Sequence, residues 1–140
     1  MNSPNKQKSI EEEIRDIKKQ TLKVLTIIFL GILSSIIYWI YFEEDLLVES
    51  QSPFDDKKVI INEVGNWFIG GSNKIKIYFK EDGRTRNFKR VEVDNFRESN
   101  TKERYNIVWI DENRISIAMV FERSTQGLEY NFTTNSIEME

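Results

Sequence analysis

Residues 24–42 read VLTIIFLGILSSIIYWIYF, nineteen consecutive positions without a charged side chain. At about 1.5 Å per helical residue this segment spans roughly 28 Å, close to the ~30 Å hydrocarbon core of a bilayer. It ends in Tyr38, Trp39 and Tyr41, which are typical of a membrane interface, and an acidic run that begins at Glu43 follows it. We therefore expect a transmembrane α-helix here, with the lipid bilayer as its first partner.

Two other interpretations of this segment fit the sequence less well. A buried core helix that is apolar on all sides would need a larger and less polar chain around it than the remaining residues supply. A cleaved signal peptide would have a shorter apolar region, followed by a small-x-small cleavage site. Because this segment instead ends in Tyr, Trp and Phe, we interpret it as an uncleaved signal-anchor.

The distribution of charge predicts the orientation of the chain. Residues 1–23 carry six Lys and Arg against four acidic residues, whereas residues 43–140 carry fourteen against nineteen. Flanks rich in Lys and Arg stay on the cytoplasmic side of a membrane. The sequence therefore predicts a single-pass protein of the cell membrane with a cytoplasmic N-terminus and an extracytoplasmic C-terminal domain.

The boundaries follow from the same composition. A capping box at Ser9–Glu12 is expected to start a helix within the tail, with acidic residues in its first turn. The expected parts are a basic, partly helical cytoplasmic tail (1–23), the transmembrane helix (24–42), an acidic linker (43–52) and an extracytoplasmic β-domain (53–140).

The C-terminal part has the alternation of apolar and polar residues that is typical of half-buried strands. The clearest case runs from Ile115 to Phe121, and a short strand is also expected at Trp67–Ile69, ended by Gly70-Gly71. Turn signals such as Asp82-Gly83 separate the runs. We expect six or seven short antiparallel strands in a meander, forming a small all-β domain that is either a sandwich or a curved sheet.

Four short motifs carry a likeness to known proteins: Ser52-Pro53, Gly70-Gly71, Arg90-Val-Glu-Val93 and Trp109-Ile-Asp-Glu112. In this order, after an N-terminal anchor, they resemble a family of small uncharacterised membrane proteins of Gram-positive bacteria. The resemblance implies a bacterial single-pass protein with an N-terminal anchor and a C-terminal β-domain. It implies no activity.

The sequence contains no His and no Cys, which excludes several functional classes. Thiolate chemistry and His-based acid–base catalysis are unavailable to such a chain. The acidic turns at Asp55-Asp56 and Asp111-Glu112 lack the spacing of a calcium-binding loop, so no metal and no cofactor are predicted. We expect a membrane-anchored binding or interaction module, for example an accessory subunit of an envelope complex, rather than an enzyme. An extracytoplasmic enzyme that uses carboxylates is the alternative.

One cluster of cations is a candidate anion-binding site. The cluster surrounds the expected hairpin turn at Gly83 and consists of Lys80, Arg84, Arg86, Lys89 and Arg90. It could hold an anionic polymer or lipid headgroups. The other interpretation is that these charges protect a strand edge from pairing. Nucleic acid is not expected as a partner, because the domain is acidic overall.

The apolar helix has a candidate association face. Small residues four positions apart, Gly31 and Ser35, lie in a heptad-like series that allows two helices to approach closely. The partner could be a second copy of this chain or another membrane or envelope protein. An Ile-rich helix can also produce such spacing by chance, in which case the segment is only an anchor.

Overall fold

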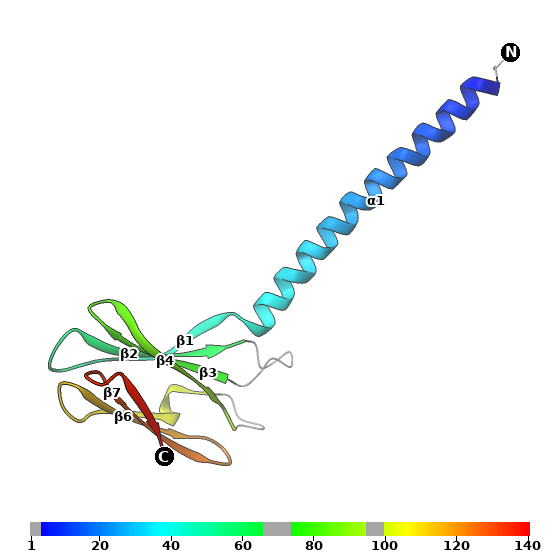
Figure 1. Cartoon of the computed structure of the whole chain (residues 1–140). Coiled ribbons are helices and arrows are strands. Elements are labelled where there is room, and N and C mark those ends of the chain that lie inside the picture. Colours follow the sequence, from blue (N-terminus) through cyan, green and yellow to red (C-terminus); the bar gives the residue numbers. More distant parts are fainter. Residues whose placement is uncertain (1–3, 66–73, 95–99) are drawn as a thin grey trace. The chain divides into compact units, whose positions relative to one another are not determined.

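The computed structural model describes residues 4–65, 74–94 and 100–140, and within these ranges one long helix precedes eight strands (Figure 1). The chain divides into two compact units, Met1–Tyr38 and Trp39–Glu140. The predicted fold class, an apolar N-terminal helix followed by an antiparallel all-β domain, is confirmed. The described part contains eight strands, more than the six or seven expected.

Helix α1 extends over Pro4–Tyr41. It is long and apolar enough to cross a membrane. The predicted helix start at the Ser9–Glu12 capping box is wrong, because Ser9 lies inside α1. Proline is well tolerated in the first turn of a helix, where its missing N–H is not needed, so Pro4 is compatible with the earlier start.

The first sheet is an antiparallel meander in the order β1-β2-β3-β4. Its strands are β1 (Glu44–Gln51), β2 (Lys57–Val64), β3 (Lys74–Glu81) and β4 (Arg84–Glu92). The prediction of an acidic linker over residues 43–52 is therefore wrong, since most of that segment forms β1 and pairs with β2. The β-domain accordingly begins before residue 53.

The second sheet repeats this arrangement in the order β5-β6-β7-β8. Its strands are β5 (Tyr105–Trp109), β6 (Arg114–Val120), β7 (Thr125–Asn131) and β8 (Ser136–Met139), and the short 3-10 helix η2 (Lys102–Arg104) precedes β5. The two sheets lie face to face (Figure 1). Of the two expected architectures, the structure has the sandwich.

One continuous apolar core lies between the sheets. Alternation places Ile75, Ile77 and Phe79 of β3 on the inner side, and all three are fully buried. The ring of Phe79 stacks on that of Tyr130 in β7, with 3.9 Å between centroids, and meets Phe132 edge-on at 6.4 Å. These contacts join the sheets directly. The expected strand at Trp67–Ile69 and the Gly70-Gly71 step lie outside the described residues.

Candidate functional site

The side of the first sheet that faces away from the core contains a cluster of cations and aromatic rings. We call the set Glu44, Lys76, Tyr78, Lys80 and Phe88 the cationic–aromatic face. It arises because β3 alternates, so that Lys76, Tyr78 and Lys80 lie opposite the buried Ile77 and Phe79. Strand β4 adds Phe88, which pairs directly with Tyr78 across the sheet.

The rings and cations of this face are in contact. The centroids of Tyr78 and Phe88 are 6.2 Å apart. The Lys76 ammonium lies 4.6 Å from the Tyr78 centroid and 5.0 Å from that of Phe88, and the Lys80 ammonium lies 5.9 Å from Tyr78. At these distances a cation is attracted to the negative face of a ring. The cluster is therefore a preformed surface on which both charges have defined positions.

Glu44 holds one side of the face in place. Its carboxylate accepts hydrogen bonds from the Tyr78 hydroxyl at 2.7 Å, from Asn62 Nδ2 at 3.0 Å and from Lys76 Nζ at 3.0 Å. Burial raises the pKa of Glu44, but these hydrogen bonds outweigh that effect and leave its pKa below the ordinary value. Glu44 therefore stays ionised, whereas no ion pair of Lys80 occurs among the described residues.

Exposed apolar area borders these charges. Phe88 is 50% exposed and Leu46, on β1, is 63% exposed. Both lie on the outer side of the sheet, where Leu46 pairs with Asn62 and Phe88 with Tyr78. Exposed aromatic residues are enriched where proteins bind other proteins, and surface charges beside them steer a partner of opposite charge.

The five predicted cations do not form one patch in the structure. Lys80 and Arg90 lie on the outer side of the sheet, whereas Lys89 pairs with the buried Ile77 and so belongs to the inner side. Arg84 is an exposed residue that pairs with Glu81 next to the turn. Arg86 occupies the irregularity in register near Lys80 and forms an ion pair with Glu81 at 3.3 Å.

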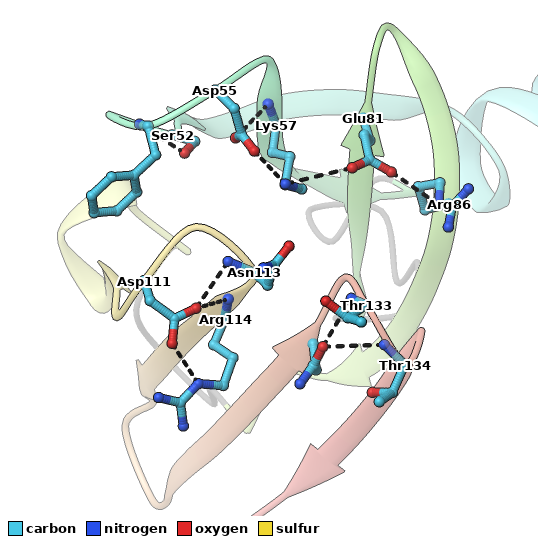
Figure 2. A network of polar contacts seen from close by, with 12 residues as sticks. Ser52, Asp55, Lys57, Glu81, Arg86, Asp111, Asn113, Arg114, Thr133 and Thr134 are labelled. Atoms are coloured by element: carbon cyan, nitrogen blue, oxygen red, sulfur yellow. Dashed lines mark hydrogen bonds and ion pairs between the residues drawn. The ribbon is translucent and has the colours of Figure 1, made fainter.

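Arg86 instead belongs to a polar network at the end of the sandwich where β2 and β4 begin (Figure 2). At its centre is Lys57, whose side chain is only 8% exposed; its ammonium binds Asp55 and lies 3.5 Å from Glu81. The hydrogen bond to Asp55 raises the pKa of Lys57. Burial raises the pKa of Asp55. The hydrogen bonds from Lys57 and Ser52 have the larger, opposite effect, so the pKa of Asp55 lies below its ordinary value. The two cations and two carboxylates of this network neutralise one another.

The same end of the domain contains an open cavity of about 660 Å³. Phe54, Ile110 and Arg114 contribute to its lining, together with the turns that follow β5 and β7. Asp111 accepts hydrogen bonds from the backbone N–H groups of Asn113 and Arg114 and from Arg114 Nε at 2.7 Å (Figure 2). The carboxylate of Asp111 therefore already has hydrogen-bond partners within its own turn and an ion pair with Arg114.

One pair of carboxylates bears on the alternative prediction, an extracytoplasmic enzyme that uses carboxylates. Asp45 and Glu63 are cross-strand neighbours on β1 and β2. Burial raises the pKa of Glu63, and the charge of Asp45 raises it further. A carboxyl with a raised pKa beside an ionised one can serve acid–base chemistry, but structural clusters of like charge produce the same shift. The pair by itself therefore assigns no reaction.

On α1, the candidate association face is open. A Cβ placed on Gly31 would meet no atom within 4 Å, and the Ser35 hydroxyl donates a hydrogen bond to the Gly31 carbonyl at 3.0 Å. Ser35 therefore satisfies its donor within the helix. The space beside Gly31 is open.

Comparisons of this chain with protein-family models, with curated proteins and with solved structures find no match. The resemblance to small Gram-positive membrane proteins therefore stays a prediction. Any functional conclusion depends on the chemistry of the surfaces described above.

Of the five residues of the cationic–aromatic face, only Lys80 belongs to the cluster predicted from the sequence. The alternation along 74–80 was visible and would have placed Lys76, Tyr78 and Lys80 on one side of a strand. Glu44 carried no such signal, because its partners lie 18 to 34 residues away.

Proposed function

We propose that this chain is a single-pass membrane protein whose β-sandwich is an extracytoplasmic binding module for an acidic partner protein, as an accessory subunit of an envelope complex would be. The observation that carries the proposal is the cationic–aromatic face. It presents Phe88, half exposed, beside two lysines whose positions the rings define. A partner that offers carboxylates and an apolar contact would complement both features.

The anchoring part of the proposal is supported by α1, which is long and apolar enough to cross a membrane. The excess of Lys and Arg before the apolar run supports a cytoplasmic N-terminus. The absence of His and Cys supports a binding role, because the commonest general base and the thiol nucleophile are missing.

Photo-crosslinking tests the binding face. A benzoyl-phenylalanine in place of Phe88, in the full-length chain in native membranes, is expected to give a protein adduct of one defined size. Lys80→Glu should reduce this adduct severalfold, because it reverses a charge that the acidic partner contacts.

Val108 is the matched control, because it is 49% exposed on the second sheet. The same crosslinker at Val108 should give no adduct of that size. An equal adduct from both positions, or one that Lys80→Glu leaves unchanged, would contradict the proposed face.

Orientation can be tested by single-cysteine labelling, since the chain has no Cys of its own. In intact cells a membrane-impermeant maleimide is expected to label Glu112→Cys and to leave Ser9→Cys unlabelled. Ser9→Cys should react only after the membrane is permeabilised. The reverse pattern would show that the domain is cytoplasmic.

Association through α1 is a further prediction of the proposal. Gly31→Ile would hold two helices apart and weaken a dimer by about 1–2 kcal/mol, roughly tenfold in affinity. A two-sided reporter assay of the helix in a membrane measures this effect, with Leu33→Ile as the control on another face. Equal signals from the wild type and both variants would mean that the spacing of Gly31 and Ser35 has no role in association.

A further inference from the structure

A second cationic site lies in the compact unit Trp39–Glu140, where the chain leaves α1. An open cavity of about 490 Å³ is lined by Tyr41, Phe42, Val64, Lys74 and Arg90. We call it the juxtamembrane pocket. We propose that this pocket binds the phosphodiester headgroup of an anionic membrane lipid. The inference rests on the membrane anchoring proposed above, but not on the partner of the cationic–aromatic face.

Backbone contacts within this unit hold the aromatic side of the pocket. The N–H of Gly65, which follows β2, donates a hydrogen bond to the Glu43 carbonyl at 2.8 Å. Gly65 has φ +79°, and a Cβ there would lie 2.7 Å from the Ile40 carbonyl oxygen. Only glycine allows such a close approach in this conformation. The segment that carries Tyr41 and Phe42 is therefore fixed beside the end of β2.

The cationic side of the pocket comes from the sheet. Arg90 pairs with Lys76 across β3 and β4, and Lys74 lies two residues before Lys76 on the same outer side. The acidic neighbour of Lys74 is Glu92, with which it pairs across the sheet. Even so, within the described residues no ion pair involves Lys74 or Arg90, whereas Lys76 is bound to Glu44. Two positive charges thus remain available to a ligand.

The chemistry of these groups fits a lipid phosphate. An arginine fork donates two parallel hydrogen bonds to phosphate oxygens, and a lysine adds a point charge. Tyr41 and Phe42 are the last residues of the apolar run, so in an anchored protein they lie at the depth of headgroups and upper acyl chains. Each Lys or Arg held near an anionic membrane surface adds a favourable electrostatic attraction between the protein and the membrane. A lipid offers both phosphate and acyl chain there, whereas a soluble phosphate offers only the first.

The test follows thermal unfolding of the full-length chain in neutral detergent micelles with three added probes. These are dihexanoyl-phosphatidylglycerol, dihexanoyl-phosphatidylcholine and glycerol phosphate. The anionic lipid is expected to raise the unfolding temperature in a saturable way, and the other two to have little effect. Lys74→Gln/Arg90→Gln should weaken the response to the anionic lipid at least tenfold.

The matched control is Arg84→Gln/Lys89→Gln, which removes one arginine and one lysine from β4 but leaves the pocket intact. It should respond as the wild type does. None of the four substituted side chains is buried, although Lys89 lies on the inner side of the sheet. Native mass spectrometry of retained phosphatidylglycerol provides a second readout that does not depend on unfolding.

Three results would overturn the inference. An equal response to glycerol phosphate would make the site a general phosphate site, and a loss as large in the control would show a non-specific charge effect. No response of the wild type would leave the pocket without a lipid. Failure of the proposed function is distinguishable from each of these, because it would appear as solubility of the chain without detergent or as no adduct from Phe88.

Discussion

Phe79→Ala is expected to lower the free energy of unfolding of the β-sandwich by about 3–5 kcal/mol, the usual cost of removing a buried aromatic ring. Phe79 is fully buried, and its ring contacts Tyr130 of the opposite sheet and Phe132 in the turn that follows β7. Its removal therefore leaves a cavity where the two sheets meet. Urea unfolding of the full-length chain in neutral detergent, followed by tryptophan fluorescence, measures the change.

Phe88→Ala is the matched control, because it removes the same side chain from the other side of the same sheet. Phe88 is 50% exposed, so its loss should cost roughly 1 kcal/mol or less, mostly from its contacts with Tyr78 and Lys76. Similar costs for the two variants would mean that the sheets do not share the core described above.

The second large effect is expected from Lys57→Met, which keeps the apolar stem but removes the buried charge. The carboxylates of Asp55 and Glu81 would lose their shared partner. A fully buried ion pair broken in this way costs ~3–5 kcal/mol. Because both carboxylates are about a third exposed, we expect about 2–3 kcal/mol here.

The neighbouring lysine provides the control. Lys58 pairs with Glu49 at 2.9 Å, but its side chain is 31% exposed, against 8% for Lys57, so Lys58→Met should cost about 0.5 kcal/mol or less. Equal costs for Lys57→Met and Lys58→Met would show that burial of Lys57 adds nothing to the ion pairs.

The effect of Lys57 also has a defined pH dependence. The pKa of Asp55 is lowered in the folded state, so its pairing stabilises the domain above the ordinary value of 3.8 and is lost as pH falls through the folded pKa. The pKa of Lys57 is raised, so its contribution persists up to the ordinary value of 10.5 and is lost at higher pH. The difference between wild type and Lys57→Met should therefore be largest between these limits and shrink in acid.

The strands that were predicted correctly share one property, which is that a single face is buried. The alternation of Ile115, Ile117 and Met119 with less apolar residues predicts which face of the strand is buried. All three residues are fully buried in the structure. The pairing of two four-stranded sheets could not be predicted in the same way. It depends on contacts such as Phe79 with Tyr130, whose partners are far apart in sequence.

The errors have physical causes as well. Residues 43–52 were interpreted as a linker because the acids are dense there, but Glu44 and Glu49 have cationic partners on β3 and β2. The five-cation patch was inferred from proximity in sequence. A strand directs neighbours to opposite faces, and an irregularity in register near Lys80 moves Arg86 out of the regular pairing.

The short connection between α1 and β1 limits how far from the membrane the binding module can meet a partner. Helix α1 ends at Tyr41 and β1 begins at Glu44, so the tether spans at most roughly 10 Å when extended. In the proposed setting the domain cannot leave the membrane surface to find a partner. Encounters then depend on lateral diffusion and on the number of partners per unit area of membrane, and concentration in the surrounding fluid matters little.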